Sequence, residues 1–203
     1  MKFINTRTVL AVLATISINA CTPTENIDIH NDQAGAIMGL DYRDFHKASS
    51  EAISSMLQSG AVNKPDGTRY VLAISRIVND TMQRIDTDQL IKKIRVELLN
   101  SGKVIVTTAV SLNKAEDSMA MHARKLRQSD EFKQNTVAQK GQMIAPDLSL
   151  SGKIIQRNLK IDSDKQQAEY YFQLSLSNIN TGLAVWEGET VIGKRGSNQA
   201  VSW

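Results

Sequence analysis

The sequence predicts an α+β domain in which a mixed β-sheet has helices packed against it. A strand, a helix and a second strand follow one another over residues 70–109, an order that favours a right-handed crossover with the two strands parallel. Apolar residues at three- and four-residue intervals mark the helices. From Pro146 onward the apolar period changes to two, which indicates antiparallel strands. The expected fold therefore joins a crossover unit to an antiparallel meander in one sheet.

The domain is predicted to begin near Asp41 with a helix that ends near Gly60. Its apolar stripe, which we interpret as core packing, consists of Tyr42, Phe45, Ser49, Ala52, Ile53 and Met56. A turn at residues 65–67 (PDG) follows. Residues 70–78 (YVLAISRIV) are then apolar at nearly every position, which predicts a strand buried on both faces.

The next helix has the clearest local signals in the chain. Asp86 is placed to cap it, with Gln89 three residues later, and Ile85 and Leu90 have the spacing of a hydrophobic staple. Its predicted buried stripe consists of Leu90, Ile91, Ile94 and Leu98. Gly102 ends the helix. Residues 103–109 are predicted to form the second buried strand.

The second half of the chain is predicted to contain two helices followed by three strands. The helices are expected at residues 113–127 and 129–140, and the strands at 148–157, 170–177 and 183–193. A polar hairpin loop at 162–167 and a turn at 178–182 join the strands. The last residues, 196–203, have no interpretable pattern and are taken as a tail.

The N-terminus is typical of a secretory signal peptide over residues 1–20. After a basic start, residues 9–18 form an apolar run that is too short to span a bilayer. Residues 18–21 (INAC) resemble a bacterial lipobox, with Asn19 where a smaller residue is usual. This predicts cleavage between Ala20 and Cys21, with Cys21 lipidated on its thiol and on its new amino group.

A simple secretory signal that leaves Cys21 as a free thiol is the alternative. Cys21 is the only cysteine, so it has no partner for an internal disulfide, and lipidation removes an otherwise exposed thiol. Thr22 follows it in place of Asp, which favours the outer membrane, with the protein facing the periplasm. Residues 21–40 are predicted to be the lipidated cysteine and a short flexible tether, and residues 41–195 the folded domain.

The charge balance argues against a polyanionic partner. Of 24 basic residues, two belong to the signal, which leaves 22 against 21 acidic residues in the mature chain. Near-neutral charge provides no field for nucleic acid. Aromatic residues amount to 5%, and no basic patch interleaves with them. We expect no nucleic acid, no small-molecule substrate and no cofactor.

The candidate metal ligands of the chain are its three histidines and one group of acidic residues. The histidines, His30, His46 and His122, have no spacing typical of a zinc site. Asp86, Asp88 and Glu97 fit three positions of a calcium-loop template, but Ile91 stands where that loop requires glycine. A helix cap is therefore the better interpretation of Asp86, and no metal site is expected.

One pair of carboxylates remains. Glu187 and Glu189 lie two apart on a predicted strand and so share one face, as paired carboxylates for acid–base chemistry would. Solvated surface residues are the preferred interpretation. Trp186 points to the opposite face, where it is expected in the core, with a partner contact as the alternative. No phosphate-binding loop or G-x-S-x-G element occurs, so neither a phosphate site of this kind nor a serine nucleophile has local support.

Four phrases, together with the lipobox, resemble the LpoB family of outer-membrane lipoproteins that activate peptidoglycan synthases. They are YVLA at 70–73 leading to NDT at 79–81, IDT at 85–87, PDLSLSGK at 146–153, and FQL at 172–174 through NTG at 180–182 to VWEG at 185–188. The resemblance covers roughly residues 41–194 and implies a fold similar to the N-terminal domain of TolB. It also implies a non-catalytic protein that binds a class A penicillin-binding protein and stimulates its synthesis of peptidoglycan.

The tether departs from this family. The best-known members have a long proline-rich segment that reaches through the peptidoglycan, whereas here about twenty residues contain one proline, Pro23. Fully extended, they span at most ~70 Å. The short tether leaves the identity of the partner open. From the whole sequence, three functions remain: an activator of a class A synthase, an envelope adaptor or subunit of a secretion or surface assembly, and a hydrolase with an unrecognised deep pocket.

Overall fold

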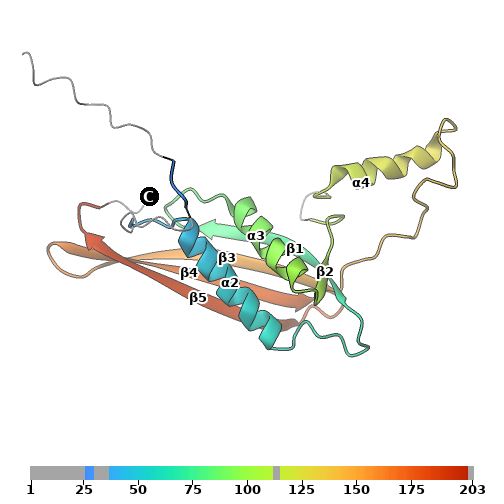
Figure 1. Cartoon of the computed structure of the whole chain (residues 1–203). Coiled ribbons are helices and arrows are strands. Elements are labelled where there is room, and N and C mark those ends of the chain that lie inside the picture. The colour runs from blue at the N-terminus through green and yellow to red at the C-terminus, as the bar shows by residue number, and fades with distance from the viewer. Residues whose placement is uncertain (1–25, 30–36, 112–114, 201–203) are drawn as a thin grey trace, which may run out of the picture. The chain divides into compact units, whose positions relative to one another are not determined.

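The computed structural model describes residues 26–29, 37–111 and 115–200. The chain divides into two units, Met1–Ala34 and Gly35–Trp203. Of the first unit, the structure describes residues 26–29, which are exposed. The second unit contains the elements of Figure 1: α2 (Tyr42–Gln58), β1 (Tyr70–Asp80), α3 (Thr87–Asn100), β2 (Val104–Val106), α4 (Ser118–Ala123), the 3-10 helix η1 (Arg124–Gln128), β3 (Leu148–Lys160), β4 (Lys165–Asn178) and β5 (Ala184–Ser197).

A five-stranded sheet in the order β2-β1-β3-β4-β5 forms the base of this unit. β1 pairs in parallel with β2 and also with β3, while β3, β4 and β5 pair antiparallel. The predicted crossover and the predicted mixed sheet are therefore confirmed. α2 and α3 lie side by side on one face of the sheet, α3 over β1 and β2 and α2 over the antiparallel strands (Figure 1).

Aspartate side chains fix where both long helices begin. Asp41 accepts hydrogen bonds from the backbone N–H groups of Arg43 and Asp44, and Asp44 in turn accepts one from the Asp41 N–H, which forms a capping box. Asp86 caps α3 by accepting from Asp88 and Gln89, as the sequence predicts. These bonds satisfy amide groups that a helix leaves without internal partners.

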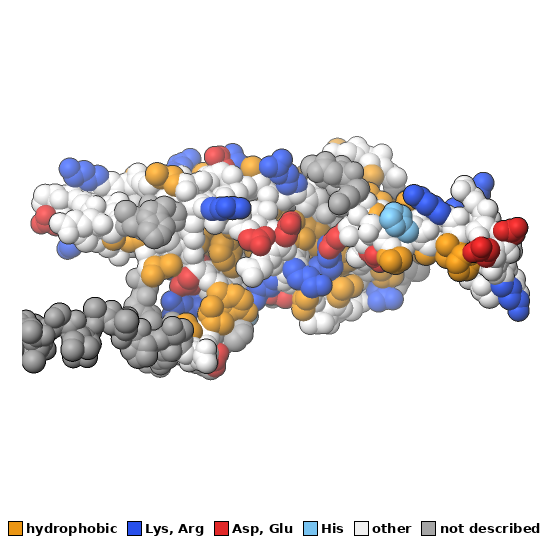
Figure 2. All heavy atoms as spheres, turned by 90° about the horizontal axis from the view of Figure 1, so that it is seen from above, with side chains coloured by type: hydrophobic (Ala, Val, Ile, Leu, Met, Phe, Trp, Pro, Cys, Tyr) orange, Lys and Arg blue, Asp and Glu red, His pale blue; other side chains and the backbone are white. Residues whose placement is uncertain are grey.

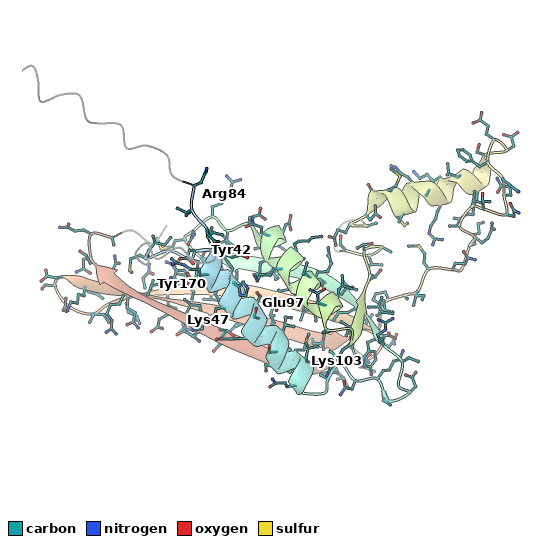
Figure 3. All side chains as sticks on the ribbon, viewed as in Figure 1. Tyr42, Lys47, Arg84, Glu97, Lys103 and Tyr170 are labelled. Atoms are coloured by element: carbon teal, nitrogen blue, oxygen red, sulfur yellow. The ribbon has the colours of Figure 1, made fainter. Side chains whose placement is uncertain are left out.

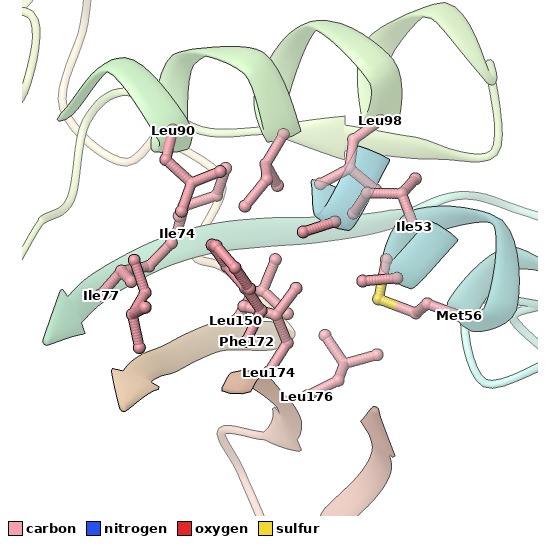
Figure 4. Close-up of a cluster of buried hydrophobic side chains, with 14 of the residues drawn as sticks. Ile53, Met56, Ile74, Ile77, Leu90, Leu98, Leu150, Phe172, Leu174 and Leu176 are labelled. Atoms are coloured by element: carbon pink, nitrogen blue, oxygen red, sulfur yellow. The ribbon is translucent and has the colours of Figure 1, made fainter. Parts of the chain in front are cut away.

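The hydrophobic core lies between the two helices and the sheet (Figure 4). Even-numbered side chains of β3 and β4 point into it, because side chains alternate between the faces of a strand. The helices contribute Ala48, Ala52, Ile53, Met56, Leu90, Ile94 and Leu98. Met38 and Leu40, just before the predicted start of the domain, are also buried, and the Tyr170 hydroxyl donates a 3.1 Å hydrogen bond to the Met38 carbonyl. Tyr170 lies beneath the start of α2 (Figure 3).

Two strand predictions need correction. Only residues 71–74 of β1 are buried in succession, because a bulge between Ile74 and Ile77 follows and leaves Val78 38% exposed. β2 ends at Val106, three residues earlier than predicted. There the Thr107 hydroxyl accepts from the Ala109 N–H, and this local turn directs the chain away from the sheet.

The helix predicted at 113–127 is confirmed in part, and the helix predicted at 129–140 is wrong. α4 starts only at Ser118, where Asp117 caps it, and η1 ends at Gln128. Residues 129–140 contain no helix. Their carbonyl groups accept hydrogen bonds from side chains instead: Gln134 donates to Ser129 and Phe132, and Gln139 donates to Gln134 and Val137. Side chains that bond to the backbone in this way compete with helix formation.

The last three strands are longer than predicted. β3 and β4 extend toward each other until residues 161–164 alone separate them, so the expected loop at 162–167 is shorter. β5 continues to Ser197, into the segment 196–203, which has no interpretable sequence pattern. Pairing with β4 explains this extension, since Lys165 of β4 aligns with Ser197.

Candidate functional site

The sheet face opposite the helices carries mostly polar side chains. On β3, β4 and β5 the odd-numbered side chains point to this face, which we call the open face, and none of them is buried. Its central members are Ser151, Lys153, Ile155, Arg157, Gln167, Glu169, Tyr171, Gln173, Ser175, Glu187, Glu189, Val191 and Arg195. No described helix packs over this part of the sheet (Figure 1).

Tyr171 lies at the centre of a cross-strand network on the open face. Its hydroxyl donates a 2.6 Å hydrogen bond to Glu169, which also accepts from Gln167 at 2.7 Å. These two bonds hold the pKa of the Glu169 carboxyl below its ordinary value, and the same contact with Glu169 raises the pKa of Tyr171. Arg157 lies 5.4 Å from the Tyr171 ring centre, and Arg195 donates to Gln167. The side chains are thus ordered by their neighbours before any partner arrives.

Glu187 and Glu189 both lie on the open face, as the sequence predicts. Gln173 donates to Glu189 at 2.8 Å and Ser175 donates to Glu187 at 3.1 Å. A shallow hollow of about 340 Å³ lies among these four side chains. Both carboxylates are exposed and bonded to neutral groups of the neighbouring strand, which fits the solvated-surface interpretation rather than an acid–base pair.

Trp186 lies on the other face of β5 and packs, partly buried, against the core. Its indole ring runs along the strand over Gly188, where an added Cβ would come within 2.4 Å of the ring. The core interpretation of Trp186 is therefore confirmed. Gly188 is small because the ring occupies the space above it.

The candidate metal ligands are not brought together. Asp86 caps α3, while Glu97 lies between α3 and α2 and accepts a 2.8 Å hydrogen bond from Ser50 (Figure 3). His46 lies on α2 and His122 on α4. In residues 26–29, 37–111 and 115–200 no three His, Cys, Asp or Glu side chains cluster as metal ligands would.

The lipobox and its surroundings lie outside the described residues, and this applies to Ala20, Cys21 and His30. Their predicted roles therefore stay predictions. Within the described part of the chain, no helix combines the length and the apolar character needed to span a membrane.

Residues 44–192 match a family model described as the peptidoglycan-synthase activator LpoB. The match begins in the first turn of α2 and ends in β5, so it includes all five strands and both long helices. The chain belongs to the LpoB family. The resemblance inferred from the four sequence phrases is thereby confirmed.

Several solved structures of the LpoB family resemble this chain. The LpoB C-terminal domain from Salmonella enterica is 17% identical over 73% of this chain and 98% of that domain, with a TM-score of 0.43. The corresponding domain from Escherichia coli is 16% identical with the same coverage and a TM-score of 0.44. The NMR structure of E. coli LpoB is 17% identical, covers 88% of this chain and 79% of its own, and has a TM-score of 0.41. A search of curated protein sequences found no significant match.

Parts of the PDLSLSGK phrase have structural roles in this LpoB-family chain. The Asp147 carboxylate accepts from the Val71 N–H at 2.9 Å, and its own N–H donates to the Val71 carbonyl at 2.7 Å. Asp147 therefore joins the start of β3 to β1. The polar open face was detectable from the alternation of Tyr171, Gln173 and Ser175, but its cross-strand partners were not, because register is a property of the folded sheet.

Proposed function

We propose that this chain is a lipid-anchored, non-catalytic activator of a class A penicillin-binding protein, held at the outer membrane through Cys21. The observation that supports this proposal most strongly is the family match over residues 44–192, which runs from the first turn of α2 into β5. The lipobox supports lipid anchoring through Cys21, and Thr22 after the cysteine supports the outer membrane as the location.

Activation without catalysis requires that the protein bind one conformation of the synthase more tightly than another. Binding then shifts the population of synthase molecules toward the active conformation. The size of this shift is limited by the difference between the affinities for the two conformations. The partner we propose is a small regulatory domain of the synthase, so the protein needs a rigid surface and not a deep pocket.

The open face is the docking surface that we propose for this domain. The opposite face of the sheet is occupied by α2 and α3, whose outer surface carries interspersed basic and acidic side chains (Figure 2). On the open face, Tyr171 and Glu169 are held by a hydrogen bond to each other within β4, and Gln173 is held by one to Glu189 of β5. Ordered polar and aromatic side chains on a rigid sheet lower the entropic cost of binding.

A cross-linked pull-down with the intact lipoprotein tests this proposal. The wild type should recover a class A synthase, and Gln173→Arg, at the centre of the open face, should recover at least about tenfold less. Glu51→Arg, which introduces an arginine at an exposed position of α2, is the control and should bind as the wild type does. Equal recovery with both variants would refute the open face as the docking surface.

The short tether favours one second candidate, an envelope adaptor or a subunit of a secretion or surface assembly. About twenty residues between Cys21 and Asp41 limit how far the domain extends from the membrane. Recovery of another envelope protein without any synthase would support this candidate and contradict the activator proposal.

A further inference from the structure

A cleft of about 500 Å³ lies between β1 and α3, away from the open face. The bulged part of β1, the first half of α3 and part of the segment after β2 form its walls. Charged and polar side chains are frequent in the lining: Arg76, Thr87, Asp88, Lys92, Arg95 and Glu116. Its volume is in the range of pockets that hold small organic molecules.

Arg95 is a buried cation in this cleft. It lies on α3 with only 7% of its surface exposed, although arginine is rarely buried to this degree without a strong partner. Both terminal nitrogens of its guanidinium donate to the two carboxylate oxygens of Glu116. Its Nε is the one buried side-chain polar atom of the described residues that lacks a hydrogen-bond partner. The Arg95 guanidinium is therefore held by Glu116 alone among the described side chains, with one buried donor left unsatisfied.

Glu116 differs from Arg95 in its exposure. Its side chain is 44% exposed, and its backbone N–H donates to the Thr108 carbonyl at 2.9 Å, which holds the residue beside the cleft. A carboxylate that binds both ends of a guanidinium has the geometry preferred for carboxylate recognition by arginine. Because 44% of the Glu116 side chain is already exposed, moving its carboxylate away from Arg95 takes it further into water and needs no new burial.

Two more cations line the cleft. Arg76 and Lys92 are exposed and form no ion pair with any residue that the structure describes. Asp88 is the other acidic residue in the lining. With Glu116 displaced, three basic side chains would face one acidic side chain, so the cleft would attract a ligand with more than one negative charge.

We propose that Arg95 is the receptor for a carboxylate of a small organic diacid, and that Glu116 occupies this receptor when the ligand is absent. The ligand carboxylate replaces that of Glu116 on the guanidinium. Its second carboxylate reaches Arg76 or Lys92. This site is separate from the proposed docking surface and does not depend on the activator proposal.

The variant Glu116→Gln tests the proposal, with the full chain and glutarate as the probe. Glu116 competes with the ligand for Arg95, so the apparent affinity for glutarate is reduced to the fraction of molecules in which Arg95 is open. Removing the charge of Glu116 should therefore strengthen the binding of glutarate. Glutarate at millimolar concentration and constant ionic strength should raise the Tm of Glu116→Gln in a saturable manner. The wild type should need at least about tenfold more glutarate for the same shift. Glu187→Gln, a matched change on the open face, should respond as the wild type does.

Arg95 and the second charge are tested separately. The double variant Arg95→Gln/Glu116→Gln should lose the saturable rise in Tm with glutarate. The double variant Lys92→Gln/Glu116→Gln should show a smaller rise in Tm with glutarate than Glu116→Gln, but the same rise with acetate. If Glu116→Gln does not fold, Glu116→Asp, which keeps the charge on a shorter side chain, should give a smaller gain in the same direction. A Tm of Glu116→Gln that is lowered and unresponsive to glutarate would show that the pair only anchors its segment. A response retained by the double variant would equally overturn the proposal.

Discussion

Lys194 Nζ lies 2.7 Å from an Asp44 carboxylate oxygen, and only 12% and 13% of the two side chains are exposed. Asp44 stands in the first turn of α2 and Lys194 near the end of β5, 150 positions later in the chain. The ion pair therefore fixes the start of α2 to the edge strand of the sheet. Asp44 also completes the capping box of α2, so one carboxylate stabilises both the helix start and its position on the sheet.

Lys194→Met should destabilise the fold by about 3 kcal/mol. The substitution keeps the aliphatic stem but leaves the largely buried Asp44 carboxylate without its cation, and an unpaired buried charge is costly. Urea unfolding measures the loss. Lys47→Met is the control: its pair with Glu51 is 4.0 Å long and exposed, and its loss should cost below about 0.5 kcal/mol. Similar losses of unfolding free energy in both variants would show that the buried pair contributes no more to stability than the exposed pair.

Gly152→Ala should destabilise the sheet by about 2–3 kcal/mol. An added Cβ would lie 2.6 Å from Leu174 Cδ2 and 2.7 Å from the Gln173 carbonyl oxygen, so β3 and β4 would have to separate locally. At Gly193 a Cβ meets nothing within 4 Å, and Gly193→Ala should leave the free energy of unfolding within about 0.5 kcal/mol. Chemical denaturation of the two variants side by side tests this. A tolerated alanine at position 152 would contradict the packing of β3 against β4 described above.

Acid should weaken the start of α2 through Asp41. Burial raises the pKa of the Asp41 carboxyl, but the Arg43 side chain, the amide groups of Asp44 and Arg43 and the charge of Lys194 together lower it below its ordinary value of 3.8. A carboxyl with a lowered pKa stabilises the fold above its unfolded-state pKa and loses this contribution as the pH falls through the folded-state pKa. Stability should therefore decline below about pH 4. In Asp41→Asn, which still caps the helix, urea midpoints should fall less steeply over this range. Parallel declines would exclude Asp41 as a source of the pH dependence.

Cys21→Ser should release the protein into the soluble periplasm or leave it unprocessed. The hydroxyl cannot replace the thiol in lipid attachment, and without acyl chains the anchor is lost. Membrane fractionation and the mass of the product measure the outcome. Cys21→Ser found in outer-membrane fractions at the mature mass would contradict the predicted lipidation.

Local patterns predicted the elements that depend on local interactions. Asp86 marked the start of α3, and the alternation around Tyr170 and Tyr171 assigned the two faces of β4, because capping and strand pleat act over a few residues. The helix expected at 129–140 was wrong for the same kind of reason. Phe132 and Val137 stand five apart, a poor fit to one helix face, and the glutamines that follow Phe132 bond to the backbone instead.

Long-range contacts left no signal in a single sequence. The parallel pairing of β1 with β3, the Lys194–Asp44 pair and the Arg95–Glu116 pair each join residues that only the folded topology brings together. Arg95 is buried beside the apolar stripe of α3, and the pattern of apolar residues did not identify it. The open face was predictable as a polar face, but its register across three strands came only from the structure.

The most direct test is the rate of glycan polymerisation by the class A synthase that the intact lipoprotein recovers. If the chain is an activator that docks through its open face, adding it should raise the rate in a saturable manner, and Gln173→Arg should need at least about tenfold more protein for half the effect while Glu51→Arg matches the wild type. An unchanged polymerisation rate at saturating wild-type protein would contradict the account.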